Sequence, residues 1–442
     1  AKNSAAEDAT LAAMLASGTD VLCVVGKSWD FHAKEVLRVT LDENLAMIED
    51  SVRFLKDAGR EVVYDAEHFF DGYRANPDYA MKTLEAAANG GADWLVLCDT
   101  NGGRLPDEIR EATARSVAMF SVPVGIHCHN DSGLAVANSL VSVEAGATMV
   151  QGTTNGIGER CGNADLTSII PNLALKMGRD CIKPEGLVKL TEISRYVWEI
   201  ANLTIPNNQP FVGVSAFSHK GGMHVHAVAK DTRTYEHIAP ETIGNERRIL
   251  ISELSGASNI TSKLQQMGFG VDKDLTRKIL NKVQDLENEG YQFEAADGSF
   301  VLLVRKIAGT YRRFFELEGF RVMITRDHND KPVCEATVKL KVGEIIRHTA
   351  AEGDGPVNAF DGALRKALED IYPNLREVQL MDYKVRVVNP RAATAAKVRV
   401  LIESKDDSAL WGTVGVSENI IEASYEALAD SIEYKLMKDE EK

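Results

Sequence analysis

Five short runs of apolar and β-branched residues, each followed by a helical pattern, constrain the fold of this chain more than any other feature. The runs span residues 21–25, 61–64, 94–98, 124–126 and 149–152. Strands that alternate with helices in this way form a parallel sheet that the helices cover. The sequence therefore predicts an α/β fold, built either as an open doubly wound sheet or as a (β/α)8 barrel.

Helix boundary signals support this count of strand and helix units. Thr40 and Glu43 have the spacing of a capping box, and Asn76 followed by Pro77 is typical of a helix start. Residues 1–18 have the pattern of a single amphipathic helix that ends at Gly18. We therefore expect one helix ahead of the first strand and helical segments after each of the five strands.

Two histidines, His127 and His129, follow the fourth run and are separated by one residue. Because alternate side chains of a strand share a face, both imidazoles are predicted to point the same way, with Cys128 on the opposite face. Two imidazoles at the end of a strand can hold a metal ion together with ligands from elsewhere in the chain. The alternative is that they are two unrelated histidines near the surface.

A glycine-rich run occupies residues 152–166, one unit further along, and reads GTTNGIGERCGNADL. Together the two stretches resemble the HMG-CoA lyase-like metalloenzymes, which include the 2-isopropylmalate, homocitrate and citramalate synthases. Residues 127–133 match the family pattern H-x-H-[DN]-D-x-G, and residues 158–164 match G-E-R-x-G-N-A. The resemblance implies a metallo-TIM barrel of which about five β/α units are present, with His127, His129 and Asn163 as metal ligands.

One motif of the family has no counterpart in the sequence. Members open their barrel with a D-x-T-L-R-D-G-like strand that supplies a metal-binding Asp and a catalytic Arg, and no such string occurs in the 442 residues. Roughly three barrel units, on the order of 90 residues, are therefore expected to be absent on the N-terminal side. We expect an N-terminally incomplete chain or gene model.

Polar residues follow the second and third runs, where a barrel places its active site. By resemblance, Glu67 in the string YDAEH is the acid/base that assists proton movement at the reacting carbons. Thr100 in the string CDTNG matches a turn whose hydroxyl binds the carboxylate of an oxo acid. A solvated loop carboxylate and an ordinary turn are the alternatives. Residues 26–30 are predicted to form a pocket wall without a chemical role.

A segment beyond the barrel, SAFSHKGGMH at residues 215–224, matches the family pattern A-F-x-H-x-x-G-I-H, with Met223 in the place of Ile. In relatives this region forms small subdomains whose His and a following Tyr reach into the active site of a partner subunit. The resemblance therefore implies catalytic roles for His224 and Tyr235. The alternative for His224 is a histidine that packs against a helix.

An internal repeat with an offset of 64 residues occupies the C-terminal part of the chain. Each copy has the pattern of three strands and a helix, and we expect both helices to bury their apolar faces against one sheet surface. The matched positions are Thr349 with Thr413, Asp354 with Glu418, Val357 with Ile421, Ala359 with Ala423, Ala363 with Ala427 and Leu364 with Leu428.

The repeat resembles the α+β regulatory domain of 2-isopropylmalate synthases, which dimerises and binds the end-product amino acid. A plain dimerisation domain is the alternative. We therefore predict three domains: a partial TIM barrel at residues 1–172, helical linker subdomains at 173–314, and a regulatory and dimerisation domain at 315–442.

Composition limits the partners and the compartment. A net charge of -15 and a pI near 5.3 argue against a nucleic-acid or anionic membrane surface. No apolar run approaches the roughly 18 residues of a membrane span, and no basic and apolar signal-peptide regions open the chain. The 6 cysteines are scattered without C-x-x-C spacing, which indicates reduced thiols in a cytoplasmic protein.

The resemblance implies an acyltransferase that joins the methyl carbon of acetyl-CoA, the co-substrate, to a 2-oxo acid. Such a Claisen-type condensation needs a Lewis acid at the oxo acid, a base for the methyl proton, and stabilisation of the enolate and alkoxide charges. A divalent ion suits the first role. Imidazole and oxygen ligands suit Mg, Mn or Zn and do not decide among them.

Three segments, at residues 26–32, 65–73 and 245–259, are more similar to citramalate synthases than to 2-isopropylmalate synthases. The resemblance implies pyruvate as the acceptor, (R)-citramalate as a product made for isoleucine biosynthesis, isoleucine as the effector, and a homodimer. The alternatives are a 2-isopropylmalate or homocitrate synthase, a lyase of the same barrel family, and a catalytically incomplete remnant that keeps only effector binding and dimerisation.

Overall fold

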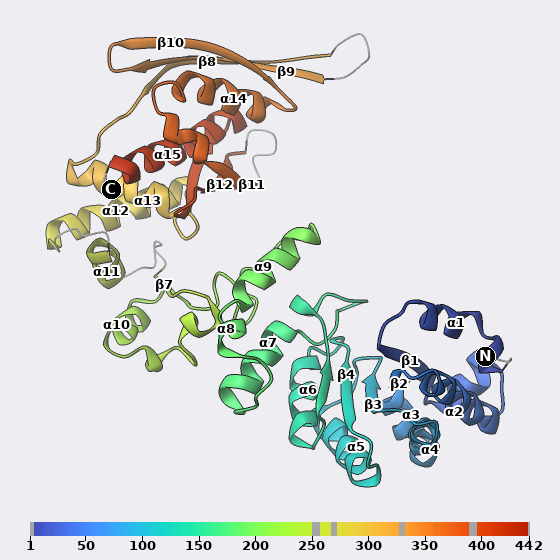
Figure 1. Cartoon of the computed structure of the whole chain (residues 1–442). Coiled ribbons are helices and arrows are strands. Elements are labelled where there is room, and N and C mark those ends of the chain that lie inside the picture. Colours follow the sequence, from blue (N-terminus) through green and yellow to red (C-terminus); the bar gives the residue numbers. More distant parts are fainter. Residues whose placement is uncertain (1–3, 250–256, 267–271, 327–331, 389–395, 441–442) are drawn as a thin grey trace. The chain divides into compact units, whose positions relative to one another are not determined.

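The computed structural model of the chain describes residues 4–249, 257–266, 272–326, 332–388 and 396–440 (Figure 1). The chain forms two compact units, the first comprising Ala1–Phe217 with Ile238–Arg247 and the second Ser218–His237 with Arg248–Lys442. Among the described helices, none combines the length and apolar character that a membrane span requires. Residues 250–256, part of the segment that resembles citramalate synthases, lie outside the described residues.

The core of the first unit is a 5-stranded parallel sheet in the order β1-β2-β3-β4-β5. The strands are β1 (Val21–Lys27), β2 (Glu61–Glu67), β3 (Trp94–Asp99), β4 (Val124–Cys128) and β5 (Met149–Gln151). The predicted strands, the α/β class and the five β/α units of the partial barrel are therefore confirmed. β1 and β2 run past their predicted ends, so Lys27 and Glu67 are strand residues rather than loop residues.

Helices pack against this sheet through one continuous apolar core (Figure 1). They are α2 (Leu41–Asp57), α3 (Phe69–Ala75), α4 (Pro77–Asn89), α5 (Pro106–Met119) and α6 (Ala135–Glu144). Tyr64 and Ile126 point into that core, as does Cys128, which is fully buried as predicted. Strand alternation turns Val63, the neighbour of Tyr64, to the opposite face, where it belongs to a separate small cluster with Val96.

Two of the helix starts follow the sequence signals. The Thr40 side chain accepts from the backbone N–H of Glu43, whose carboxylate accepts from Thr40, so the predicted capping box precedes α2. Asn76 caps α4, with Pro77 at its first position. These caps satisfy backbone N–H groups that would otherwise lack partners at the helix ends.

The single helix predicted for residues 1–18 is wrong. The structure has a short 3-10 helix, η1 (Ala5–Glu7), and then α1 (Ala9–Ala16). The break falls at Asp8, whose extended backbone is that of an N-cap and whose side chain accepts from the N–H groups of Thr10 and Leu11. A strong capping residue thus starts a new helix inside an otherwise continuous amphipathic pattern.

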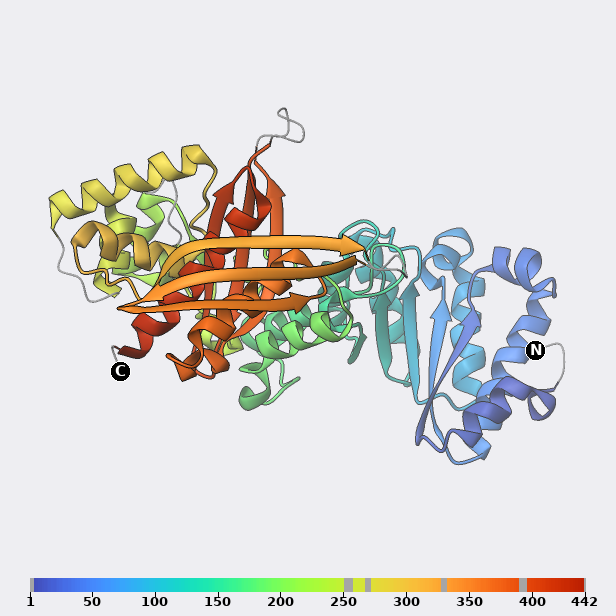
Figure 2. The ribbon, with the colours of Figure 1, turned by 90° about the horizontal axis from the view of Figure 1, so that it is seen from above.

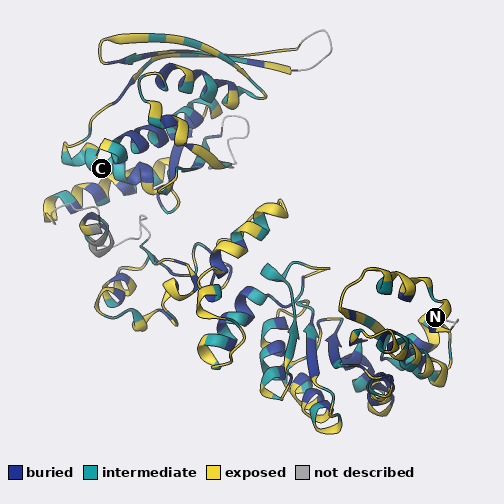
Figure 3. Cartoon of the chain, viewed as in Figure 1, coloured by how far each residue is buried: buried dark blue, intermediate teal, exposed yellow. Residues whose placement is uncertain are grey.

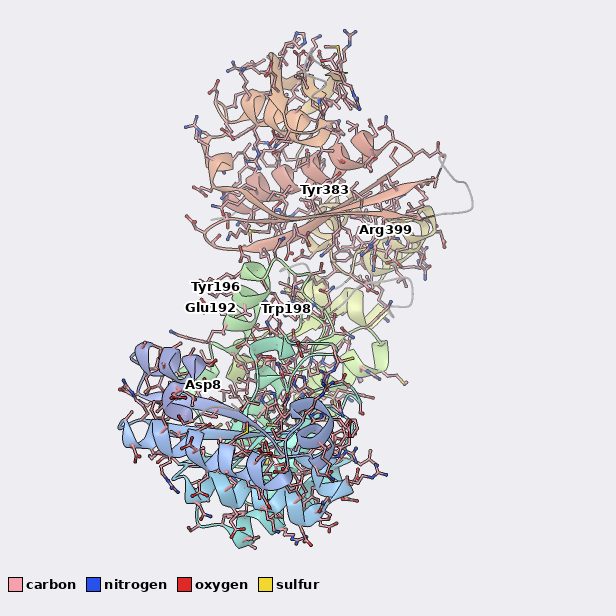
Figure 4. The ribbon with its side chains drawn as sticks, turned by 90° about the vertical axis from the view of Figure 1, so that its right-hand side faces the viewer. Asp8, Glu192, Tyr196, Trp198, Tyr383 and Arg399 are labelled. Atoms are coloured by element: carbon pink, nitrogen blue, oxygen red, sulfur yellow. The ribbon has the colours of Figure 1, made fainter. Side chains whose placement is uncertain are left out.

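The rest of the first unit is mainly helical and includes α7 (Leu166–Pro171), α8 (Pro184–Leu187) and α9 (Leu190–Ile200). Figure 4 shows Glu192 and Tyr196 on one side of α9 and Trp198 on the other. Tyr196 is exposed, whereas the indole of Trp198 donates to Gln209 over 2.9 Å. This bond ties α9 to the loop that follows it.

The second unit begins with α10 (Gly222–Lys230) and a 2-stranded sheet of β6 (Ser218–His219) and β7 (Arg248–Ile249). Three more helices follow, α11 (Ala257–Gln266), α12 (Lys273–Glu289) and α13 (Asp297–Ala308). Their apolar residues form one cluster with Val414 and Val416 of the C-terminal repeat. These helices and the repeat are therefore parts of one packed body.

Each copy of the repeat has the predicted order of three strands and a helix. The first copy is β8 (Glu316–Arg326), β9 (Pro332–Val342), β10 (Ile345–Gly353) and α14 (Pro356–Leu368), and the second is β11 (Gln379–Val387), β12 (Val398–Lys405), β13 (Leu410–Ser417) and α15 (Ile420–Glu440). The same hydrogen bond recurs in both, since Thr349 Oγ1 donates to the carbonyl of Ala363 and Thr413 Oγ1 to that of Ala427, each over 2.7 Å.

The expectation of one shared sheet surface is wrong, because the copies form two separate antiparallel sheets (Figure 2). Within each copy the strands pair with their sequence neighbours, and each helix packs on its own sheet. The two helices meet in a common core that includes Phe360, Leu364, Leu428 and Ile432. Figure 3 shows the buried side of both helices in dark blue.

Candidate active site

Polar side chains gather at the C-terminal ends of the five parallel strands, the edge at which barrel enzymes carry their active sites. β1 ends at Lys27, β2 at Glu67 and β4 just before His129, while Thr100 directly follows β3. The fold therefore brings the residues predicted from the barrel segment to one edge of one sheet.

Glu67 forms an ion pair with Lys27, a residue to which the sequence analysis gave no chemical role. The two residues are register partners on adjacent strands, and each side chain is 25% exposed. Asn44 Nδ2 donates to the carbonyl of Lys27 over 2.8 Å, and the N–H of Ser28 donates to that of Glu67 over 3.1 Å. The signal that could have identified Lys27 is its place at the end of a barrel strand.

Thr100 lies between the second and third strand ends. Its hydroxyl oxygen accepts from the backbone N–H of His68 over 2.8 Å, in a stretch where His68 has a left-handed φ of 56°. Because a hydroxyl can donate while its oxygen accepts, Thr100 retains a hydrogen that can be donated to a further acceptor.

A buried carboxylate, Asp71, braces the loops around Thr100. It bonds to His68 Nδ1 over 3.0 Å, to Arg104 over 2.8 Å and to Asn101 over 2.9 Å. Burial opposes its ionisation, but the bond from His68 and the charge of Arg104 hold the pKa of Asp71 below its ordinary value. Asp71 therefore remains an anchor for both loops at neutral pH.

His127 and His129 project from the same side of the fourth strand end, with ring centroids 5.2 Å apart. His129 pairs with Asn163 in an isolated β-bridge, and the N–H of Asn130 donates to the carbonyl of Gly162 over 2.9 Å. Backbone pairing thus joins the histidine strand to the glycine-rich loop and places Asn163 beside His129.

Arg160 adds a side-chain link between the two motifs. It bonds to both carboxylate oxygens of Asp131, over 2.8 and 3.0 Å, and to the carbonyl of Thr100 over 2.7 Å. Bidentate contacts between an arginine and a carboxylate fix the relative orientation of the two side chains and also pair their charges. Arg160 therefore connects the glycine-rich loop to the histidine strand and to the Thr100 turn.

Two glycines allow close packing in the glycine-rich loop beside Asn163. A Cβ at Gly158 would lie 2.2 Å from Asn163 Nδ2, and one at Gly162 would lie 2.0 Å from the carbonyl oxygen of Gly156. Gly162 also has a φ of +92°, which side chains rarely adopt. Close packing against Asn163 and between backbone segments of the loop therefore requires glycine at both positions.

The residues around this point fit a divalent metal ion. His129 Nδ1 and Asn163 Oδ1 are buried and have no hydrogen-bond partner among the described residues. Burial and the nearby charges of His127 and Arg160 lower the pKa of His129, which favours the neutral imidazole that binds metals. Imidazole nitrogens and an amide oxygen are suitable ligands for the Mg, Mn or Zn ion predicted from the sequence.

A further pair of residues, Asp65 and Gln151, was missed by the sequence analysis. His127 Nδ1 lies 2.9 Å from Gln151 Oε1, and Gln151 Nε2 lies 2.9 Å from Asp65 Oδ1. Burial raises the pKa of Asp65, while its hydrogen bonds with Gln151 and Cys23 oppose that rise. No sequence motif marks this chain of contacts, since its members come from three different strands.

The second unit brings together the other two predicted catalytic residues. The rings of His224, on α10, and Tyr235 are stacked with centroids 3.9 Å apart and an interplanar angle of 22°. Both side chains are exposed, Tyr235 by 47%, so His224 is not a buried packing histidine. By contrast, the neighbouring His219 is buried and bonds to Glu236 over 3.1 Å.

Three family models match consecutive parts of this chain. Residues 3–197 match the HMGL-like family, residues 211–291 the homocitrate synthase post-HMGL domain-like family, and residues 294–436 the LeuA allosteric (dimerisation) domain. The resemblance inferred from the two barrel motifs and from the C-terminal repeat is therefore confirmed.

Full-length relatives refine this assignment. (R)-Citramalate synthases of Aquifex aeolicus and Geobacter sulfurreducens are each 55% identical to this chain, over 98% of it and 83% of their own length. A probable 2-isopropylmalate synthase of Methanopyrus kandleri is 33% identical over 91% of this chain and 78% of its own length. The chain therefore belongs to the (R)-citramalate synthase family.

Proposed function

We propose that this protein condenses acetyl-CoA with pyruvate to form (R)-citramalate and CoA. The observation that carries the proposal is the meeting of Glu67, Thr100 and the His127 region at one sheet edge, in a chain 55% identical to (R)-citramalate synthases over 98% of its length. Acid/base, carboxylate-binding and metal-ligating groups on adjacent strand ends are what this condensation needs.

The reaction begins with removal of a proton from the methyl group of acetyl-CoA. Glu67 assists this proton movement, and Lys27 holds its carboxylate at the end of β2. The resulting carbanion forms a bond to the C2 carbon of pyruvate, whose oxygen then takes up a proton. Water cleaves the thioester, which releases citramalate and CoA.

Pyruvate is held by groups that match its two polar ends. The hydroxyl of Thr100 donates to its carboxylate. His127, His129 and Asn163 would hold a divalent ion, which when bound polarises the keto oxygen as a Lewis acid. Selection of pyruvate over 2-oxoisovalerate rests on about two methyl groups, each worth roughly 1–3 kcal/mol in a pocket.

The remaining assignments extend this proposal to the whole protein. The LeuA-type domain supports a homodimer, in which His224 and Tyr235 serve the site of the partner subunit and isoleucine is the effector. We propose three domains, at residues 1–172, 173–314 and 315–442. We also propose that the enzyme serves isoleucine biosynthesis. The 6 free cysteines support a cytoplasmic location.

The test measures CoA release from acetyl-CoA with pyruvate, 2-oxoisovalerate or 2-oxoglutarate, followed by chiral analysis of the product. We expect (R)-citramalate from pyruvate, and only background with the other acids. Glu67→Gln serves as the inactive control. A preference for 2-oxoisovalerate or 2-oxoglutarate would support 2-isopropylmalate or homocitrate synthase, and isoleucine binding without turnover of any acid would support the remnant hypothesis.

A further inference from the structure

His127 belongs to a hydrogen-bond chain that spans β4, β5 and β2. The chain runs from His127 Nδ1 to Gln151 Oε1 and from Gln151 Nε2 to Asp65 Oδ1, with both distances 2.9 Å. His127 and Gln151 are register partners on adjacent strands, and Asp65 is buried. The backbone of the sheet therefore holds all three side chains in place.

The polarity of each link follows from the chemistry of its groups. An ionised Asp65 only accepts hydrogen bonds, so the amide of Gln151 must turn its NH2 group toward it. That orientation leaves the Gln151 oxygen, which also only accepts, facing His127. The imidazole hydrogen must then sit on Nδ1, and the lone pair remains on Nε2.

We propose that Gln151 is a positioning residue that holds His127 in the Nδ1–H tautomer and so leaves Nε2 available as a metal ligand. Asp65 acts through Gln151 by fixing the direction of its amide. The proposal rests on the assignment of His127 as a metal ligand in the proposed function. Metal-binding histidines commonly donate their second ring N–H to an oxygen, and loss of that partner weakens metal affinity about 10–100-fold.

The opposite polarity is the competing arrangement. A protonated Asp65 could donate to the Gln151 oxygen, and the amide NH2 would then donate to His127 Nδ1. Burial raises the pKa of Asp65, whereas hydrogen bonds from Gln151 and Cys23 oppose that rise and stabilise the ionised carboxylate. The two polarities differ in one measurable respect, which is the ring nitrogen of His127 that carries the hydrogen.

The experiment records nitrogen-15 NMR spectra of the metal-free full chain at a pH where His127 is neutral, with signals assigned from a His127→Gln variant. Protonated and unprotonated ring nitrogens have well-separated shifts, so the tautomer is read directly. We expect Nδ1–H in the unaltered protein and a shift to Nε2–H in Gln151→Leu. Gln379→Leu, at an exposed glutamine of β11, is the matched control and should change nothing.

A double variant, Asp65→Asn/Gln151→Glu, exchanges the amide and the carboxylate and preserves an acceptor for Nδ1–H. It should restore the Nδ1–H tautomer. Zn²⁺ affinity, measured by chelator competition, should fall about 10–100-fold in Gln151→Leu and recover in the double variant. This recovery separates positioning from general loss of structure.

An Nε2–H tautomer in the unaltered protein or in the double variant overturns the proposal, as does an unchanged tautomer in a folded Gln151→Leu protein. If Gln151→Leu does not fold, the tautomers of the unaltered protein and of the double variant still test the proposal. The spectra need neither metal nor substrates, so an error in the proposed reaction leaves them unaffected. An Nδ1–H tautomer without any Zn²⁺ binding would instead count against His127 as a ligand.

Discussion

The ammonium group of Lys27 is paired with the carboxylate of Glu67 across the ends of the first two strands. If Lys27 acts only by placing Glu67, the two substitutions should not be additive. We expect Glu67→Gln to lower kcat about 10²–10⁴-fold and Lys27→Met to lower it less. The double variant should be no slower than Glu67→Gln alone in a CoA-release assay. Additive losses would show that Lys27 has a separate role.

The metal site gives a second prediction, based on the unpartnered atoms of His129 and Asn163. Full-length protein should bind one divalent ion per subunit, and the His127→Ala/His129→Ala double variant should bind none in elemental analysis after dialysis. His226→Ala, at an exposed histidine of α10, is the control and should retain the ion. Unchanged stoichiometry in the double variant would refute the assignment.

The stacked pair of His224 and Tyr235 leads to a prediction about the dimer. Subunits carrying His224→Ala and subunits carrying Glu67→Ala should each be inactive as homodimers. A mixed dimer should recover part of the activity, because one of its two sites receives both unaltered groups. The measurement is CoA release by heterodimers isolated with two affinity tags. Absence of recovery in verified heterodimers would place His224 in the site of its own subunit.

A buried ion cluster in the second unit predicts a pH-dependent stability. Lys435, whose side chain is 1% exposed, bonds to Asp406 over 2.7 Å and to Glu377 over 2.6 Å. Burial opposes the ionisation of Asp406, but the hydrogen bonds from Lys435 and Lys438 hold the pKa of Asp406 well below its ordinary 3.8. A carboxylate with a depressed pKa stabilises the fold fully above 3.8 and loses that contribution as the pH falls toward the folded-state value.

Lys435→Met should therefore cost roughly 3 kcal/mol of unfolding free energy at pH 7, because it removes one of the two ammonium groups that pair with the buried Asp406. The difference from the unaltered protein should shrink below about pH 4, where Asp406 is protonated in the unfolded chain. Urea unfolding at several pH values measures both effects. Lys366→Met, at an exposed lysine of α14, should have little effect at any pH. A pH-independent loss would mean that packing rather than charge is responsible.

Regulation provides a further prediction, based on the two βββα copies. Isoleucine should inhibit the condensation, with a coupling of about 1–3 kcal/mol, or roughly 5- to 150-fold, and leucine should not. The test measures CoA release by the intact chain with and without each amino acid. A chain that ends at Phe315, before the repeat, is unsuitable because α13 packs against β13 and α15, and the truncation would expose that surface. Inhibition by leucine alone would contradict the assignment to isoleucine biosynthesis.

The elements that could be predicted from the sequence are those whose signals are local. Short apolar and β-branched runs, each followed by a helical pattern, identified the five strands, and the spacing of Thr40 and Glu43 identified a cap. The repeat was found because matched positions such as Thr349 and Thr413 keep the same residue for the same hydrogen bond. Each of these signals lies within one element or between two copies of one element.

What could not be predicted depends on which strands lie side by side and in which register. Lys27 and Glu67 are 40 residues apart, and Asp65 and Gln151 are 86 residues apart, so no local pattern connects them. The separation of the two sheets also depends on nonlocal pairing, which a repeat in the sequence does not reveal. The break at Asp8 was missed because a cap outweighed a continuous apolar pattern.

The two βββα copies also have a consequence for how the chain folds. Each copy pairs only sequence neighbours within its sheet, so its contacts form over short loops and should form quickly. One polypeptide contains two similar modules, and an oligomer contains more. During synthesis a strand or helix of one module can therefore pair with the wrong module. Divergence between the copies outside their shared threonine, alanine and leucine positions should act against such exchange. Making the copies more alike should therefore slow productive folding and increase swapped assemblies.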